Sequence, residues 1–142
     1  MIEQLVGITF KTDSHEGLEE YMEAQKVNFL LRKVAKNLTI YETLTQEGDE
    51  FTYSFESTFK NHKFTFKLGE PFVDKGPDGR DMKTTFTAEG DKLVAVLENI
   101  KPNDVPARIE RVVRPDGSLQ VTLTSIPTNT VCKRRYVVHR KK

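Results

Sequence analysis

The chain has 142 residues, of which 37% are hydrophobic and 30% are charged, and its 22 Lys and Arg nearly balance its 21 Asp and Glu to give a formal net charge of +1. This length fits a single domain over residues 1–142, and the balanced charge excludes a general attraction to nucleic acid or anionic membranes. No segment approaches the roughly 20 apolar residues that a membrane-spanning helix needs.

The N-terminal segment and the cysteine content indicate the compartment. The sequence MIEQLVGITFKTD carries an acidic residue at position 3 and has no long apolar run, so we expect no signal peptide. The single cysteine, Cys132, excludes an internal disulfide and fits a reducing compartment. We therefore expect a cytoplasmic protein.

Residues 14–36 form the region with a helical pattern. Its first half is rich in Glu, Leu, Met and Ala, which are good helix formers. Apolar residues recur at helical spacing in both halves. They are Leu18, Tyr21, Met22, Leu30, Leu31 and Val34. The pattern predicts two short helices joined near Lys26.

From Leu38 onward, apolar and polar residues alternate with the period of two that is typical of β-strands. The alternating apolar sets include Phe51, Tyr53 and Phe55; Phe64, Phe66 and Leu68; Met82, Phe86 and Ala88; Leu93, Ala95 and Leu97; and Leu119, Val121 and Leu123. Clusters of Gly, Pro, Asp and Asn lie between these sets and favour turns. Strands at a spacing of roughly 8–12 residues predict an antiparallel meander, sandwich or barrel.

Polar side chains fall on the apolar faces of several of these strands. Thr84, Arg111 and Arg134 are the clearest cases. A filled core would not accept them, because an unpaired buried charge is costly. A barrel that encloses a water-containing cavity would accept them. The pattern therefore favours a barrel with an internal cavity.

The C-terminal segment concentrates positive charge, because six of its last ten residues are Lys or Arg and the rest of the chain carries 16 basic against 21 acidic residues. If the segment is a β-strand, its side chains point alternately to opposite faces. Cys132, Arg134 and Tyr136 then share one face, and Lys133 and Arg135 lie on the other.

A second arginine occupies a similar position in residues 108–113, where Ile109, Arg111 and Val113 share a face. If this face also points inward, the cavity holds two guanidinium groups and one phenol. A carboxylate suits such a cluster, because it accepts paired hydrogen bonds from Arg and a further one from a Tyr hydroxyl. The alternation alone equally allows both arginines to lie on exposed faces opposite acidic residues.

Residues suited to catalysis or metal binding form no recognisable pattern. His15, His62 and His139 are far apart and are interpreted as surface residues, and Cys132 as a small apolar filler in a strand. The sequence lacks a Gly-rich phosphate loop, a zinc-ligand spacing and a nucleophile elbow. We therefore expect no enzyme, no catalytic residue, no metal and no cofactor.

Several segments, in order, closely resemble the intracellular fatty-acid-binding protein family, which includes the cellular retinoid-binding proteins. The most specific are FESTFKN (55–61) and FTFKLGEPF (64–72), followed by VNFLLRKV (27–34), EGDKLV (89–94) and VCKRRY (131–136). The resemblance runs over nearly the whole chain. It implies an all-β fold, a ten-stranded antiparallel up-and-down β-barrel capped by a helix-turn-helix lid over about residues 15–36.

The resemblance also implies a function and a ligand. The expected function is intracellular binding and transport of a long-chain fatty acid, by a monomer that holds one ligand in a water-containing cavity. Retinoic acid is the alternative ligand, and a nucleic-acid-binding barrel with exposed aromatic residues is the alternative class. We expect no nucleic acid partner.

Family members with an Arg…Arg-x-Tyr arrangement hold the ligand carboxylate with those three residues. Arg134 and Tyr136 match the end of this motif directly. The first arginine matches Arg111, or else its neighbour Val112 if the gap slides by one; we choose Arg111 because Ile109 and Val113 flank it. The residues implied to contact the hydrocarbon chain or form the portal are Leu18, Tyr21, Met22, Val27, Leu31, Ala35, Ile40, Phe55, Phe59, Lys60, Pro77 and Asp78.

Some features depart from the family pattern. Gly7-Ile8-Thr9-Phe10 stands where the family usually has Gly-x-Trp. Arg32 and Lys33 match two positions of a basic nuclear-import patch, but Glu23 stands at the third, so nuclear import is not supported. The terminal Arg140-Lys141-Lys142 is either a solvated end or a transient contact for anionic membranes during ligand transfer.

Overall fold

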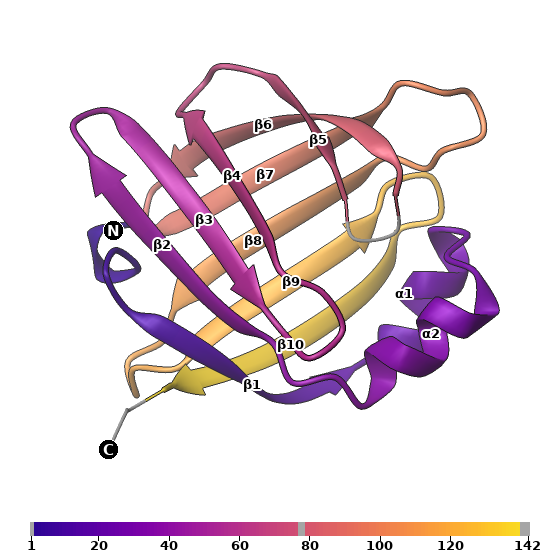
Figure 1. Cartoon of the computed structure of the whole chain (residues 1–142), viewed down its shortest axis with the longest axis horizontal. Coiled ribbons are helices and arrows are strands. Elements are labelled where there is room, and N and C mark those ends of the chain that lie inside the picture. The colour runs from indigo at the N-terminus through magenta and orange to yellow at the C-terminus, as the bar shows by residue number, and fades with distance from the viewer. Residues whose placement is uncertain (1, 77–78, 140–142) are drawn as a thin grey trace.

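The computed structural model describes residues 2–76 and 79–139, which form ten β-strands and two α-helices (Figure 1). In chain order the elements are η1 (Ile2–Gln4, a 3-10 helix), β1 (Thr9–Glu16), α1 (Leu18–Ala24), α2 (Phe29–Lys36), β2 (Tyr41–Glu47), β3 (Glu50–Glu56), β4 (His62–Lys67), β5 (Phe72–Lys75), β6 (Asp81–Glu89), β7 (Lys92–Asn99), β8 (Ala107–Val113), β9 (Leu119–Ser125) and β10 (Thr130–Val138). The strands form one antiparallel sheet in the order β4-β3-β2-β1-β10-β9-β8-β7-β6-β5. The predicted ten-stranded antiparallel barrel with two helices is confirmed.

The sheet curls on itself, so that β2, β3 and β4 lie in front of β7 to β10 in Figure 1. Its two edge strands, β4 and β5, are not hydrogen-bonded to each other as a ladder. A side-chain contact spans this gap instead, because Nε2 of His62 on β4 lies 3.0 Å from Oδ2 of Asp74 on β5. The barrel is therefore nearly closed.

The two helices lie together over one end of the barrel (Figure 1), as the sequence predicted. Helix α1 begins at Leu18, slightly later than expected, because His15 and Glu16 still pair with Arg134 and Lys133 of β10. Asn28 caps α2, since its side chain accepts a hydrogen bond of 2.9 Å from the backbone N–H of Leu31.

Gly17 lies where β1 ends and α1 begins against β10. Its φ is 75°, and a Cβ at this position would lie 2.5 Å from the backbone oxygen of Val131. We expect Gly17→Ala to lower the free energy of unfolding by about 2 kcal/mol, because the left-handed backbone costs a side chain roughly 1–2 kcal/mol and the crowding adds to it. Urea unfolding measures this change.

Gly48, in the turn between β2 and β3, is the matched control. Its φ is 65°, but nothing lies within 4 Å of the position of its Cβ. Gly48→Ala should therefore lower the free energy of unfolding only by the cost of the left-handed backbone, roughly 1–2 kcal/mol, without the cost of crowding. Equal losses for the two variants would contradict the close approach of α1 to β10.

The buried side chains form two clusters. The larger one is rich in aromatic residues, and its rings are close, as for Phe66 and Phe86, whose centroids lie 4.1 Å apart. The smaller cluster lies under α1 and consists of Leu18, Tyr21, Met22 and Cys132. Among the described residues, no helix has the length and apolar character needed to cross a membrane.

Candidate ligand-binding cavity

A cavity of about 400 Å³ lies inside the barrel beneath the two helices, and its wall is mostly apolar. Of the residues expected to contact a hydrocarbon chain or form the portal, ten line it. They are Leu18, Tyr21, Met22, Val27, Leu31, Ala35, Ile40, Phe55, Phe59 and Lys60. Pro77 and Asp78, the other two expected portal residues, lie outside the described residues.

The three residues expected to bind a carboxylate also line this cavity. Arg111 and Arg134 both pair with Val121 of the strand between them, so they lie in one cross-strand row. Their Cα atoms are thus about 10 Å apart, two strand spacings, with both side chains on the inner face. Arg111 rather than Val112 faces inward, because Arg111 is buried and lines the cavity.

Arg111 is already paired with a carboxylate of the protein itself. Its Nε donates a hydrogen bond of 3.0 Å to Oε1 of Glu42 on β2, and the Tyr53 hydroxyl donates one of 2.7 Å to the same oxygen. The guanidinium carbon lies 4.7 Å from the centroid of the Tyr53 ring. Glu42 is 1% exposed and Arg111 is 7% exposed, so this is a buried ion pair.

Burial and charge act against each other at this pair. Burial alone would lower the pKa of Arg111, but the neighbouring Glu42 carboxylate raises it, and the net pKa of Arg111 lies above its ordinary value. Burial raises the pKa of the Tyr53 and Tyr136 phenols. Both phenols therefore stay protonated near neutral pH and can donate a hydrogen bond.

The interpretation of the sequence missed Glu42 and Tyr53. A signal was present, because Ile40, Glu42 and Leu44 alternate and Ile40 was already assigned to the cavity. Tyr53 likewise shares its face with Phe55. The alternation predicts that Glu42 points inward, but it does not predict which cation Glu42 meets.

Arg134 differs from Arg111 because its guanidinium is not paired with a carboxylate of the described residues. Its Nε is buried and has no hydrogen-bond partner there. The guanidinium carbon lies 5.7 Å from the centroid of the Tyr136 ring, on the same side of β10. An oriented donor without a partner, in the wall of an apolar cavity, can bind an anionic or hydrogen-bond-accepting head group.

Polar contacts hold the helical lid over the cavity. The buried side chain of Gln25, at the end of α1, donates hydrogen bonds of 2.9 Å to Ser125 Oγ and 3.2 Å to the Pro106 carbonyl oxygen. Arg80, just before β6, donates one of 2.6 Å to the Gln25 carbonyl oxygen. These contacts join the end of α1 to the barrel near the starts of β6 and β8 and the end of β9.

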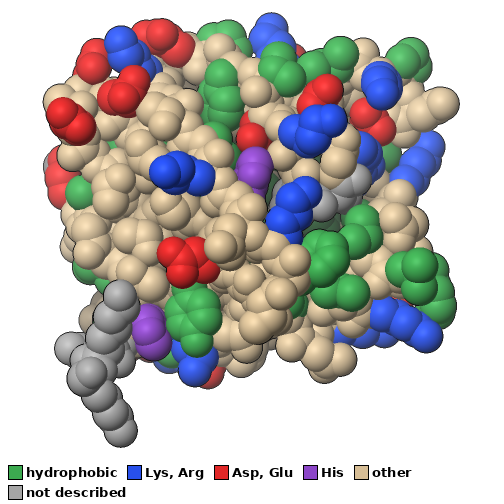
Figure 2. All heavy atoms as spheres, in the orientation of Figure 1, with side chains coloured by type: hydrophobic (Ala, Val, Ile, Leu, Met, Phe, Trp, Pro, Cys, Tyr) green, Lys and Arg blue, Asp and Glu red, His purple; other side chains and the backbone are tan. Residues whose placement is uncertain are grey.

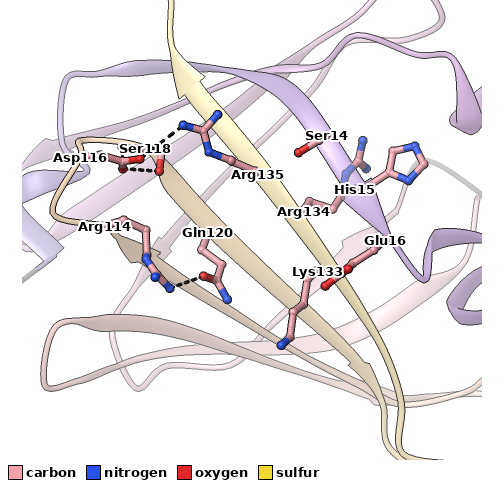
Figure 3. A pocket seen from close by; sticks show the side chains of 10 residues that line it. All are labelled: Ser14, His15, Glu16, Arg114, Asp116, Ser118, Gln120, Lys133, Arg134 and Arg135. Atoms are coloured by element: carbon pink, nitrogen blue, oxygen red, sulfur yellow. Dashed lines mark hydrogen bonds and ion pairs between the residues drawn. The ribbon is translucent and has the colours of Figure 1, made fainter.

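A second hollow, of about 440 Å³, lies on the outer face of β10 and β9 and is polar (Figure 3). Arg135 donates hydrogen bonds there to Asp13 at 2.6 Å and to Asp116 at 3.3 Å. Hydrogen bonds from Ser118 lower the pKa of Asp116 to about 2. Lys133 and Arg135 line only this outer hollow, whereas Arg134 lines both the hollow and the inner cavity. Arg134 shares the inner face of β10 with the buried Cys132 and Tyr136, as the strand alternation predicted.

Cys132 lies in the small cluster beneath α1 and is completely buried. Burial raises the pKa of its thiol to about 11, so very little thiolate exists near neutral pH. This position agrees with the interpretation of Cys132 as an apolar filler. Among the described residues, no cluster of His, Cys, Asp and Glu is arranged to hold a metal ion.

Comparison with known proteins finds a family match and relatives among the fatty acid-binding proteins. Residues 6–142 match the family described as "Lipocalin / cytosolic fatty-acid binding protein family". Fatty acid-binding protein homolog 6 of Caenorhabditis elegans is 36% identical over 138 residues, which cover 97% of this chain and 98% of that protein. A fatty acid-binding protein of Tyrophagus putrescentiae is 34% identical over 85% of this chain and 88% of that protein.

Solved structures are similar over the full fold. The crystal structure of apo lipid binding protein 8 of Caenorhabditis elegans superposes with a TM-score of 0.90, at 29% identity and with 98% of each chain covered. A Schistosoma mansoni fatty acid binding protein in complex with arachidonic acid superposes with a TM-score of 0.88, at 28% identity and with 98% of each chain covered.

Proposed function

This chain belongs to the lipocalin / cytosolic fatty-acid binding protein family, and we propose that it binds and transports a long-chain fatty acid held in the cavity beneath its two helices. The observation that carries this proposal is the apolar cavity with the unpartnered Arg134 donor in its wall. The complex of the Schistosoma mansoni relative with arachidonic acid supports the same class of ligand.

Affinity comes from the hydrocarbon chain and orientation from the head group. Burying the chain contributes about 0.8 kcal/mol per CH₂ before the costs of association. The carboxylate enters the polar end of the cavity, where Arg134 and Tyr136 can donate hydrogen bonds to it and Arg111 lies beside them, paired with Glu42. These donors favour an acid over the corresponding alcohol or ester. The residues in these roles bind and orient a ligand, and we propose no catalytic step.

Ligand passage requires movement of the lid, because the helices cover the end of the barrel. Opening would break the hydrogen bond from Arg80 to the Gln25 carbonyl oxygen. Phe59, which is exposed on the turn between β3 and β4, lines the same cavity as Leu31 and Ala35 of α2. We propose that the protein acts in the cytoplasm as a monomer.

Transient contact with anionic membranes fits the surface of α2. Phe29 and Leu30 are strongly exposed, and Nζ of Lys33 lies 4.7 Å from the centroid of the Phe29 ring. Figure 2 shows basic and hydrophobic side chains intermixed at the helical end of the molecule. Such a mixed surface can attract anionic head groups and insert apolar side chains between them. The terminal residues 140–142, to which the sequence first assigned this contact, lie outside the described residues.

Extraction of the purified protein with organic solvent, followed by mass spectrometry, tests the ligand class. We expect a long-chain fatty acid, and a fluorescent fatty acid should then saturate the delipidated protein near one ligand per chain with little dependence on salt. Recovery of retinoic acid would identify the alternative ligand. Absence of saturable binding of any hydrophobic carboxylate, or steeply salt-dependent binding of single-stranded nucleic acid, would contradict the proposal.

A further inference from the structure

We propose that Glu42 is a built-in carboxylate that occupies Arg111, so that the head group of the ligand binds Arg134 and Tyr136 and the cavity selects a single carboxylate over two. This inference deepens the proposed function and depends on it. Glu42 is then a residue that determines specificity, and Arg111 is a positioning residue that does not contact the ligand.

The contacts of Glu42 leave Arg111 poorly available to a ligand. Oε1 of Glu42 accepts hydrogen bonds both from Arg111 and from Tyr53. The guanidinium carbon of Arg111 also lies 4.7 Å from the Tyr53 ring centroid and 5.8 Å from that of Phe55, so aromatic rings cover it. A ligand carboxylate could reach Arg111 only by displacing the buried Glu42 or by lying beside it, and two adjacent carboxylates in an apolar site repel each other.

Arg134, in contrast to Arg111, is available to a ligand. It lines the same cavity, its Nε has no hydrogen-bond partner among the described residues, and it forms no ion pair with them. Tyr136 is its neighbour on the inner face, and the guanidinium carbon of Arg134 lies 5.7 Å from that ring. The donors available to a carboxylate are therefore concentrated on β10.

The net charge of the inner wall follows from these contacts. Glu42, Arg111 and Arg134 together carry one net positive charge. The other charged side chains of the cavity lining have partners of their own or are exposed. His62 pairs with Asp74, Arg80 contacts the Gln25 carbonyl oxygen, and Glu56 and Lys60 are exposed and opposite in sign. One carboxylate neutralises the inner wall, and a second would leave a buried negative charge, which is costly.

Two probes that differ by one carboxylate test this selection. Palmitate carries one, and tetradecylmalonate has the same chain with a second carboxylate on the carbon next to the first. At a pH where both groups of the malonate are ionised, the wild-type protein should bind palmitate more tightly. Glu42→Gln adds one net positive charge to the cavity and should lower the ratio of palmitate affinity to tetradecylmalonate affinity by about tenfold or more.

The control is Glu47→Gln, which removes a carboxylate at the exposed end of the same strand and should leave the ratio unchanged. Both affinities are measured by displacement of the same fluorescent fatty acid. A general loss of folded protein therefore affects both equally and cancels in their ratio. If Glu42→Gln keeps the ratio of the wild type, the inference is overturned, although the fatty-acid function stands as long as the wild type binds palmitate. Failure of the wild type to bind palmitate would instead overturn the proposed function, and the inference with it.

The double variant Glu42→Leu/Arg111→Met provides a second test that does not leave a buried charge unpaired. It removes the whole ion pair and keeps the net charge of the inner wall, so palmitate affinity should stay within about threefold of the wild type. A loss of about tenfold or more would mean that Arg111 contacts the ligand directly, and would overturn the inference even if Glu42→Gln does not fold.

Discussion

Replacing Arg111 with alanine should lower the free energy of unfolding by about 3–5 kcal/mol, because it leaves the buried Glu42 carboxylate without its cation. The loss would be one of the largest that a single substitution can cause in this chain, since Glu42 is 1% exposed and cannot reach bulk water for compensation. Urea unfolding followed by circular dichroism measures it.

The double variant Glu42→Leu/Arg111→Met should recover most of this loss, because apolar side chains of similar volume can replace a buried ion pair at little cost. Arg108→Ala is the matched single control. It removes an arginine from the same strand. This arginine is partly exposed, and its Nη2 lies 3.4 Å from Oε1 of Glu89. An ion pair at such an exposed position contributes at most about 1 kcal/mol. If Arg111→Ala lowers the free energy of unfolding no more than Arg108→Ala does, Arg111 does not compensate a buried charge on Glu42.

Arg134→Ala should weaken the binding of a long-chain fatty acid by about 1.5–3 kcal/mol, which is roughly a tenfold to hundredfold rise in Kd. The reason is the loss of charge-assisted hydrogen bonds to the carboxylate inside a cavity with few other free donors. Displacement of a fluorescent fatty acid gives the affinity, and the methyl ester of the same acid separates head-group recognition from burial of the chain. The variant should bind the ester about as well as the wild type does.

The neighbouring residue supplies the control for this prediction. Arg135→Ala removes the same charge from the outer face of β10, where Arg135 pairs with Asp13 and Asp116, and it should leave the affinity nearly unchanged. Unchanged affinity in Arg134→Ala, or equal losses in both variants, would contradict the assignment of Arg134 to the ligand carboxylate.

These predictions separate two arginines that looked alike in the sequence. Both lie on inner strand faces, and the family motif assigns both to the ligand carboxylate. In the structure one is covered by aromatic rings and held by a carboxylate of the protein, whereas the other has a free donor in the cavity wall. We therefore expect Arg111→Ala to act mainly on stability and Arg134→Ala mainly on binding.

The sequence by itself determined seven of the ten strands, β3, β4 and β6 to β10, and the direction of their side chains. Alternation is a local property of the extended backbone, so the placement of Arg134 inside and of Lys133 and Arg135 outside could be predicted from neighbouring residues alone. The hydrocarbon-contacting positions on α1, α2, β2 and β3 followed from the family resemblance, and those in the described part of the chain do line the cavity.

Only the tertiary structure decided which charged groups meet. Glu42 and Arg111 are 69 residues apart, on strands that are not neighbours in the sheet, and they touch because the sheet curls and brings β2 across the cavity from β8. Curling depends on the twist and register summed over many strands, which no short segment encodes. Local alternation could place both side chains inside the barrel, but only its closure made them partners and left Arg134 as the free donor.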